Sequence, residues 1–370
     1  MKLAVLGYQD VEDINLWSGI PYHAFNAFQR EKTIDVTKVF PSQEPLLPGN
    51  SLFRFYFNFI QKARQPYYYH YNKSYIEYKN DQINKYIRRI KPDYILTFWP
   101  YQVAYLETVV PIIIWTDATI DLLIKTWGYD RMANVSQKDA LQAEHDALSR
   151  ATLAVYSSDW AASSARNIYN VDPNKVKVIG FGANILRFPA FSKEVSKNKC
   201  NLLFIGYDYI RKGLQKAIDI TEAVNSLGLE AILTVIGPEQ NINSKYVKFL
   251  GRLSKDDTEE YSRIVNAYNE ATFFLLPTFS EPFGIVFCEA SYFGVPSLSH
   301  NVGGVSNVIE DGVNGKLFLL DSSPNDFATY IKSVFSNWPQ YMALRNSTRS
   351  HYETNLSWEV SIKRLSNFLI

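Results

Sequence analysis

Short apolar runs recur along the chain and alternate with segments of helical periodicity. Each run has the length and aliphatic composition of a parallel strand that is buried on both faces. The predicted strands span residues 1–6, 94–98, 112–115, 153–156, 176–180, 201–206, 231–236 and 271–276. Their alternation with helices predicts an α/β fold of doubly wound parallel sheets.

Apolar positions three and four residues apart predict the intervening helices. In the first helix Phe25 and Phe28 share one face, and the pattern ends near Arg30. Further helices are predicted over residues 82–89, 161–169, 214–225, 285–293, 325–346 and 358–369.

The chain of 370 residues is too long for one ordinary domain, and two domains are expected. Residues 185–199 are polar and irregular, which favours a hinge there. We therefore predict a first Rossmann-like domain over 1–185, a second over 186–350 and a closing helical segment over 351–370.

Charge and cysteine content narrow the function classes. The 38 basic and 37 acidic residues nearly cancel, so nucleic acid is not expected as a partner. Cys200 and Cys288 lie far apart and fit a reducing compartment in which they pack as small hydrophobes. The first apolar run is too short for a signal peptide, and no run is long enough to span a bilayer. We expect a cytoplasmic protein.

Residues 53–78 combine many aromatic side chains with interleaved basic ones. This composition fits an acceptor-binding lip, a membrane-surface face or a packed pair of helices, because tyrosine suits sites with one apolar and one wet side. The sequence leaves these three interpretations open, and peripheral membrane contact is one of them.

Two carboxylates frame the segment that follows the strand at 271–276. Glu281 lies on the loop, and Glu289 lies in the helix that begins near Gly284. Ligands of open α/β sheets bind beyond the carboxyl ends of strands, and a helix N-terminus attracts phosphate. We expect Glu281, Phe283 and Gly284 to face a phosphate-linked group and Glu289 to accept hydrogen bonds from a ribose diol.

Three further charged residues lie at strand ends. Arg211 and Lys212 follow the strand at 201–206, where they could pair with a diphosphate or remain solvated. Asp117 closes the strand at 112–115, where it could contact a ligand, while Asp117 or Thr119 could equally cap the next helix. A lone glycine turn after the first strand lacks the spacing of a dinucleotide fingerprint, so NAD is disfavoured.

The segment Glu281-Pro-Phe-Gly-Ile-Val-Phe-Cys-Glu289 carries a family resemblance. Together with Gly294-Val-Pro296, Gly303-Gly304 and residues 310–315, it resembles the E-x7-E region of retaining glycosyltransferases of family 4, the glycosyl transferases group 1. The resemblance implies a GT-B fold, in which two Rossmann-like domains face a central cleft and the last helix packs back on the first domain. The chain departs from the pattern at Ser306-Asn307, where many members have Pro-Glu.

The resemblance also implies roles for individual residues. Lys212 matches the lysine that clamps the donor diphosphate. The position of the family's arginine is occupied by Tyr207, so we expect the neighbouring Arg211 to supply the guanidinium. Asp117 matches a residue beside the sugar or the acceptor hydroxyl.

The remaining donor contacts implied by the family come from three places. The glycine-containing first loop corresponds to Ser18 and Gly19, although Gly19 also suits a plain helix start. The nucleobase pocket corresponds to Arg252 and Leu253. Beside Glu289, the segment Phe283, Gly284 and Ile285 is implied to bind the donor.

These observations predict transfer of a sugar from a nucleotide diphosphate sugar to a hydroxyl acceptor, with retention. Glu281, Asp117, Lys212 and Arg211 are the predicted catalytic residues, and no metal or other cofactor is expected. A nucleotide-sugar epimerase and a catalytically silent sugar-nucleotide or glycan-binding protein are the alternatives.

Overall fold

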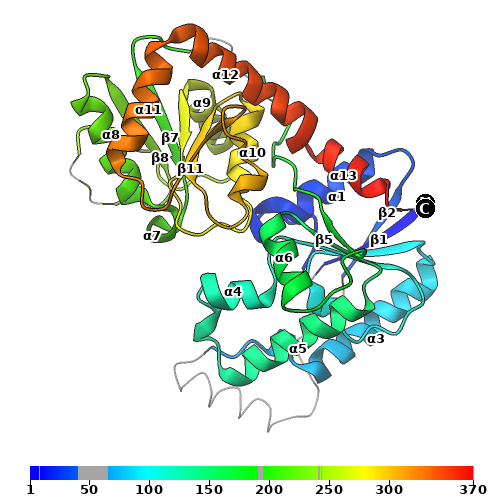
Figure 1. The fold of residues 1–370 in the computed structure, drawn as a ribbon. Helices are drawn as coiled ribbons and strands as arrows, with labels where there is room; N and C mark the ends of the chain where they lie inside the picture. Colours follow the sequence, from blue (N-terminus) through cyan, green and yellow to red (C-terminus); the bar gives the residue numbers. More distant parts are fainter. Residues whose placement is uncertain are drawn as a thin grey trace. The chain divides into compact units, whose positions relative to one another are not determined.

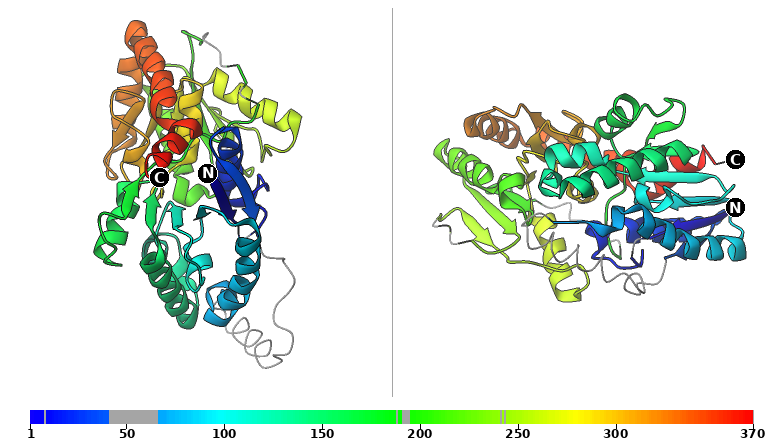
Figure 2. Two further views of the ribbon diagram at one scale, coloured as in Figure 1. Left: turned by 90° about the vertical axis from the view of Figure 1, so that its right-hand side faces the viewer. Right: turned by 90° about the horizontal axis from the view of Figure 1, so that it is seen from below.

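The structure is a computed structural model that describes residues 1–7, 9–40, 66–187, 189–190, 195–240, 242 and 244–369. The chain divides into two compact units, Met1–Ile179 and Gly180–Ile370. Each unit contains one parallel sheet, and helices cover both faces of each sheet (Figures 1 and 2).

The sheet of the first unit has the strand order β2-β1-β3-β4-β5-β6. Its strands are β1 Lys2–Leu6, β2 Asp35–Val39, β3 Tyr94–Thr97, β4 Ile112–Thr116, β5 Leu153–Tyr156 and β6 Val176–Val178. Its helices are α1 Ile20–Arg30, α3 Lys73–Ile90, α4 Ile120–Thr126, α5 Asn134–Arg150 and α6 Asp159–Asn167. Strand β4 is buried along its whole length, as expected for a strand covered on both faces.

The sheet of the second unit has the order β12-β11-β10-β7-β8-β9. Its strands are β7 Cys200–Ile205, β8 Ala231–Ile236, β9 Val247–Phe249, β10 Phe273–Leu275, β11 Ser297–His300 and β12 Gly315–Phe318. Its helices are α7 Tyr209–Lys212, α8 Leu214–Ser226, α9 Thr258–Glu270, α10 Ile285–Tyr292, α11 Pro324–Ser336, α12 Trp338–His351 and α13 Trp358–Ser366.

The predicted fold class is confirmed, with differences in single elements. Strands β2, β9, β11 and β12 lack the continuous apolar run that predicts a buried strand, and the sequence pattern did not indicate them. Helix α3 begins at Lys73, well before the predicted start at residue 82, because the Asn72 side chain caps it by accepting from the N–H groups of Ser74 and Tyr75. The predicted domain boundaries and the packing of residues 351–370 on the first domain stay predictions.

The aromatic segment 53–78 is described only from residue 66 onward, and residues 53–65 lie outside the described residues. Tyr67, Tyr71 and Tyr75 are buried. Tyr71 packs edge-on against Tyr101, with ring centroids 5.2 Å apart. These tyrosines therefore pack in the first unit, while acceptor binding and membrane contact stay open for the segment as a whole.

Both cysteines are buried and free, as the sequence predicted. Burial raises the pKa of the Cys200 thiol and of the Cys288 thiol, so both behave as small apolar side chains. Among the described residues, no helix combines the length and the hydropathy that a membrane crossing needs.

Candidate functional site

The strand order of the second unit places a topological switch point between β7 and β10. Strand β7 pairs with β8 on one side and with β10 on the other. From β7 the chain continues to β8 and β9 on one side, and from β10 it continues to β11 and β12 on the opposite side. Ligands of open α/β sheets bind in the crevice outside the carboxyl ends at such a point. The loop after β7 carries Arg211 and Lys212, and the loop after β10 carries Glu281.

The two loops approach each other closely at Gly213. This glycine has φ +76°, and a Cβ atom there would lie 2.2 Å from the carbonyl oxygen of Pro277. Only glycine fits a left-handed backbone with so little space. The Arg211 carbonyl oxygen also accepts hydrogen bonds from Phe279 N, at 2.8 Å, and from Thr278 Oγ1, at 3.0 Å. The backbone therefore fixes the two charged loops against one another.

Lys212 and Glu281 form an ion pair across the switch point. Their side chains are 13% and 8% exposed, so the pair is largely withdrawn from water. Arg211 Nη1 lies 3.6 Å from the same Glu281 carboxylate and donates to the Ser280 carbonyl oxygen at 2.9 Å. Asp208, which caps α7, holds the other side of the guanidinium at 3.2 Å. The structure thus brings together the three charged residues predicted from both loops.

Helix α10 begins beside this cluster. Gly284 is its N-cap with φ +95°, and no side chain caps the helix, so its first N–H groups are available to an anion. Phe283 is buried and Ile285 is half-buried. Gly304 N donates to the Glu281 carbonyl oxygen at 3.0 Å, and a Cβ on Gly303 would lie 2.1 Å from that oxygen.

Glu289 is a buried residue of α10, and its carboxylate accepts hydrogen bonds from two side chains of the described residues. Lys255 Nζ lies 2.5 Å from its Oε1 atom, and the Tyr268 hydroxyl donates to its Oε2 atom at 3.1 Å. Lys255 also donates to the Asn184 carbonyl oxygen at 2.9 Å. The sequence reading missed Lys255. Its only signal was its position four residues after Gly251, in the loop assigned to the nucleobase.

The two residues predicted for the base differ in exposure. Arg252 is exposed, and its guanidinium lies over the Tyr207 ring, 5.5 Å from the centroid. Leu253 is buried, and its carbonyl oxygen accepts a hydrogen bond from the Tyr207 hydroxyl at 3.1 Å. Tyr207, at the position of the family's arginine, thus connects the loop after β7 with the loop that holds Arg252 and Leu253.

His300 is a buried residue that the sequence reading did not assign to the site. Its Nδ1 atom lies 3.1 Å from the Thr278 carbonyl oxygen, and its buried Nε2 atom has no hydrogen-bond partner among the described residues. Burial lowers the pKa of His300, so a neutral ring is favoured. With the Nδ1–H donating to Thr278, the ring braces the loop that leads to Glu281.

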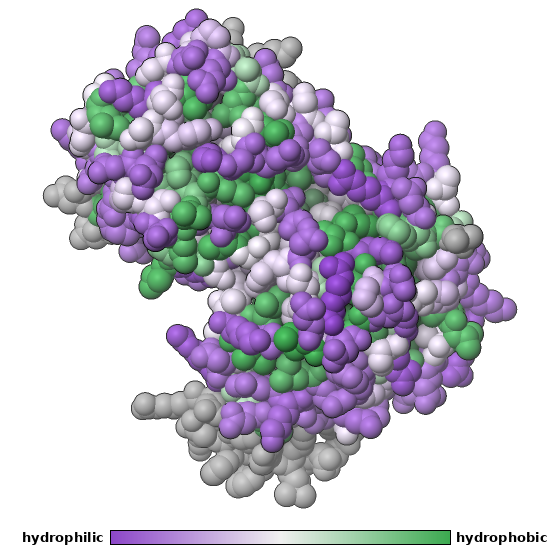
Figure 3. Space-filling view, viewed as in Figure 1, coloured by the Kyte–Doolittle hydropathy of each residue, from purple (hydrophilic) through white to green (hydrophobic). Residues whose placement is uncertain are grey.

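Large apolar side chains are exposed at the same carboxyl edge of the second sheet. They follow β7, β10 and β12 and comprise Tyr207, Ile210, Phe279, Leu319 and Leu320. Figure 3 shows hydrophobic atoms protruding at α7 among hydrophilic neighbours. The charged cluster therefore has an apolar rim, which is typical of a ligand-binding edge.

In the first unit the switch point lies at β1, between β2 and β3. The loop after β1 contains Trp17, Ser18 and Gly19, with φ of 45°, 56° and 80°. Consecutive left-handed residues are unfavourable for side chains other than glycine, by about 1–2 kcal/mol each. The Trp17 ring packs against Trp99 after β3, with centroids 5.9 Å apart, which helps to hold the loop. Gly19 is the left-handed N-cap of α1, so its helix-start role is met.

Asp117 lies after β4, at the same carboxyl edge of the first sheet, and is half-buried. The cap of α4 is Thr119, whose Oγ1 accepts from Leu122 N at 3.4 Å. Of the two caps considered from the sequence, the structure therefore has Thr119, and the Asp117 side chain is not the cap.

The first turn of α4 is held by two further side chains. Ile120 N donates to buried Glu144 at 2.7 Å, and Asp121 N donates to the Tyr169 hydroxyl at 3.2 Å. Burial raises the pKa of Glu144 to about 8, although hydrogen bonds from Tyr169 and Ile120 oppose this shift. With Thr119, these side chains satisfy the first three N–H groups of the helix and fix the turn after Asp117.

No group of three or more potential metal ligands occurs among the described side chains. The predicted residues of the second unit, Glu281, Lys212, Arg211, Gly284 and Glu289, share one sheet edge. Ser18, Gly19 and Asp117 share the corresponding edge of the first unit.

A family comparison matches most of the second unit. The model of the glycosyl transferases group 1 matches residues 189–351. The matched residues include the Lys212–Glu281 pair, the start of α10 and the Lys255–Glu289 pair.

Curated relatives of the chain are named as glycosyltransferases. The chain is 25% identical over 253 residues to a D-inositol 3-phosphate glycosyltransferase of Thermobifida fusca, which covers 62% of this chain and 56% of that protein. It is 26% identical over 223 residues to an uncharacterised glycosyltransferase of Methanocaldococcus jannaschii, covering 54% of this chain and 55% of the relative. The chain thus spans about half the length of these relatives.

Solved glycosyltransferase structures show the fold along the whole chain. Sucrose-phosphate synthase of Thermosynechococcus elongatus aligns with a TM-score of 0.69 and 14% identity, covering 100% of this chain and 98% of that one. HepE of Anabaena in complex with UDP-glucose aligns with a TM-score of 0.64 and 14% identity, covering 100% and 99%. These neighbours confirm the predicted GT-B fold.

Proposed function

We propose that the protein is a retaining glycosyltransferase of family 4 that moves a hexosyl group from a nucleotide diphosphate sugar to a hydroxyl acceptor. The observation that carries the proposal is the Lys212–Glu281 pair at the β7–β10 switch point, beside the uncapped start of α10. A diphosphate and a sugar ring are the groups that a cation, helix amides and a carboxylate would bind together.

The donor diphosphate replaces the Glu281 carboxylate as the partner of Lys212. Arg211 and the first N–H groups of α10 bind the same phosphates. As the bond from the anomeric carbon to the diphosphate breaks, negative charge grows on the leaving phosphate. Each fixed donor contributes on the order of 3 kcal/mol at that stage. These groups would stabilise the leaving diphosphate without a metal ion.

Glu281, released from Lys212, accepts hydrogen bonds from sugar hydroxyls and stabilises positive charge on the ring. Glu289 accepts hydrogen bonds from the ribose hydroxyls, while Lys255 and Tyr268 orient its carboxylate. Arg252 and Leu253 belong to the pocket of the donor nucleobase. Phe283 and Ile285 flank Gly284 at the start of α10.

Ser18 and Gly19 are donor-binding residues in this proposal, and Asp117 is one of its catalytic residues. The strained loop at Ser18 and the braced turn after Asp117 supply fixed polar groups at one sheet edge. Asp117 would lie beside the sugar or the acceptor hydroxyl. The proposed acceptor is a hydroxyl of a glycan, a lipid or a small molecule. The proposed location is the cytoplasm, and peripheral contact with a membrane stays open.

The test is turnover with a panel of nucleotide sugars and acceptors. UDP-glucose is the first donor, because HepE is solved with it, and D-inositol 3-phosphate is the first acceptor, because curated relatives carry its name. We expect nucleotide release that depends on acceptor, and NMR of the product should show the anomeric configuration of the donor. An inverted product would overturn retention.

The same assay separates the alternatives. An epimerase would convert the nucleotide sugar without an acceptor, and a silent binding protein would release no nucleotide. Chelation with EDTA should leave the rate unchanged. Sedimentation with anionic vesicles tests the membrane contact.

A further inference from the structure

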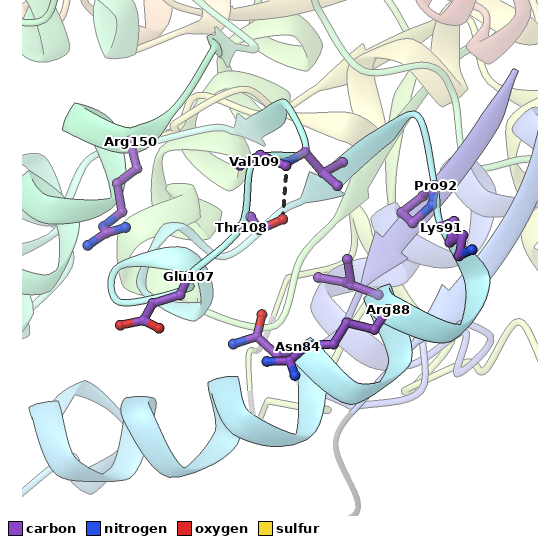
Figure 4. A pocket seen from close by; sticks show the side chains of 10 residues that line it. Asn84, Arg88, Lys91, Pro92, Glu107, Thr108, Val109 and Arg150 are labelled. Atoms are coloured by element: carbon purple, nitrogen blue, oxygen red, sulfur yellow. Dashed lines mark hydrogen bonds between the residues drawn. The ribbon is translucent and has the colours of Figure 1, made fainter.

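A cavity lies in the first unit at the amino ends of β3 and β4, the sheet edge opposite to Asp117 and Ser18. Its volume is about 710 Å³. Helix α3 forms one wall, and the loop of Glu107, Thr108 and Val109 before β4 forms the other (Figure 4). Because parallel strands place their two ends at opposite edges, this cavity is separate from Asp117 and Ser18, the groups of the first unit that are assigned to transfer.

Asn84 contributes a polar side chain to the cavity lining. Its side chain projects from the middle of α3 beside the Arg88 guanidinium (Figure 4). Asn84 is only 8% exposed, and its carboxamide makes no hydrogen bond among the described residues. The carboxamide faces the cavity, where water or a polar ligand can form hydrogen bonds with it. Helix capping does not explain a residue two turns from the helix end.

The charges around the cavity favour an anion. Arg88, Lys91 and Arg150 line it against a single carboxylate, Glu107. Arg88, Lys91 and Glu107 take part in no ion pair within the described chain, and Arg150 donates only to the Leu106 carbonyl oxygen, at 3.2 Å. The ends of α3 and α5 add about half a negative charge each, which leaves a net positive charge of about one.

The helix dipoles alone explain part of this pattern. Basic residues are favoured in the last turn of a helix, which accounts for Arg88 and Arg150. They do not account for Asn84. They do not explain Lys91 either, because this residue takes a left-handed conformation with φ +47°, where glycine or asparagine is preferred.

We propose that this cavity binds a small phosphorylated polyol such as a sugar monophosphate. The phosphate pairs with Arg88 and Lys91, while the Asn84 carboxamide and the Glu107 carboxylate bind the hydroxyls. Ile87 and Val110 provide an apolar wall for the carbon skeleton. The site is distinct from the donor and acceptor groups and does not depend on the transferase activity.

The experiment is equilibrium dialysis of the full chain against radiolabelled glucose 1-phosphate, at fixed ionic strength, with and without saturating UDP. We expect binding in both conditions, and weaker binding of inorganic phosphate or of glucose alone, because each satisfies half of the site. Arg88→Ala and Asn84→Asp should each weaken binding at least tenfold, the latter through charge repulsion.

The matched control is Lys85→Ala, which removes an exposed charge from the same helix but outside the cavity lining. Its affinity should equal that of the wild type. An equal loss of binding in Lys85→Ala would mean that the overall charge of α3, and not a contact in the cavity, determines the affinity, and this would overturn the site. Full binding in Arg88→Ala and Asn84→Asp, competition by UDP, or no binding at 10 mM glucose 1-phosphate would overturn the site.

Discussion

Lys212 donates a hydrogen bond to the Glu281 carboxylate, and this contact joins the loops after β7 and β10. The two residues are far apart in the sequence, and the parallel pairing of β7 with β10 brings them together. The proposed reaction needs both side chains, yet in the free protein each neutralises the other. In the proposed reaction the donor would therefore have to separate the pair.

Lys212→Met should lower kcat/KM by about 10²–10³, because one fixed donor to the leaving phosphate is lost. The substitution also leaves Glu281 with Arg211 alone, so the free energy of unfolding should fall by up to about 3 kcal/mol. Kinetics and urea unfolding measure the two effects.

The double variant Lys212→Met, Glu281→Gln separates stability from catalysis. It should regain most of the stability, because no unpaired charge remains, and stay inactive. Lys316→Met, which breaks the exposed pair with Asp311, is the control and should change neither quantity noticeably. Wild-type turnover in the double variant would exclude the proposed roles.

Glu289→Gln should raise the KM for the nucleotide sugar about tenfold, with a smaller change in kcat, because the ribose contact is made before and during the reaction. Tyr268→Phe keeps the Lys255 contact and removes one hydrogen bond. It should raise KM less and cost about 1 kcal/mol of stability. If both variants leave KM unchanged, Glu289 does not bind the donor.

Glu144 should make the protein less stable as pH rises from about 4.5 to about 8. Its folded pKa, about 8, is above the ordinary value of 4.5, so the folded state binds more protons than the unfolded state in this window. The slope should approach about 1.4 kcal/mol per pH unit in mid-window. Urea unfolding of Glu144→Gln should show this slope removed, while Glu270→Gln, at an exposed carboxylate, should retain it.

Gly213→Ala should destabilise the protein more than Gly228→Ala. Both glycines have positive φ, +76° and +84°, so both variants incur about 1–2 kcal/mol of backbone strain. Only at Gly213 does the new Cβ also meet the Pro277 carbonyl oxygen, whereas nothing lies within 4 Å at Gly228. Gly213→Ala should also lower kcat/KM by displacing Lys212. Equal losses in the two variants would contradict this account.

The sequence predicted the sheets best where the strands are apolar and buried, as in β4 and β8. It missed β11, because Ser297, Ser299 and His300 read as polar although all are buried. Ser299 donates to the Leu276 carbonyl oxygen at 2.8 Å, and His300 Nδ1 lies 3.1 Å from the Thr278 carbonyl oxygen, whereas Ser297 Oγ is buried without a partner among the described residues. Periodicity does not register such internal hydrogen bonds, because the partners come from another strand.

The site residues, like the strands, were predictable only where local sequence signals marked them. Glu281, Glu289 and Lys212 were predictable because each follows a recognisable strand end or helix start. Lys255 was not, since its pairing with Glu289 depends on how the loop after β9 returns across the sheet. The turn at Asp117 shows a similar limit, because its bracing by Glu144 and Tyr169 involves two distant segments.

Glu281 is anchored by its main chain as well as by its side chain, since its carbonyl oxygen accepts from Gly304 N while Gly303 leaves space for the approach. The position of the residue is thus set independently of the group it carries. Exchange of the carboxylate for an amide would therefore change the charge of this side chain without rebuilding the surrounding backbone. A variant at position 281 accordingly separates the contribution of the charge from that of the main-chain position.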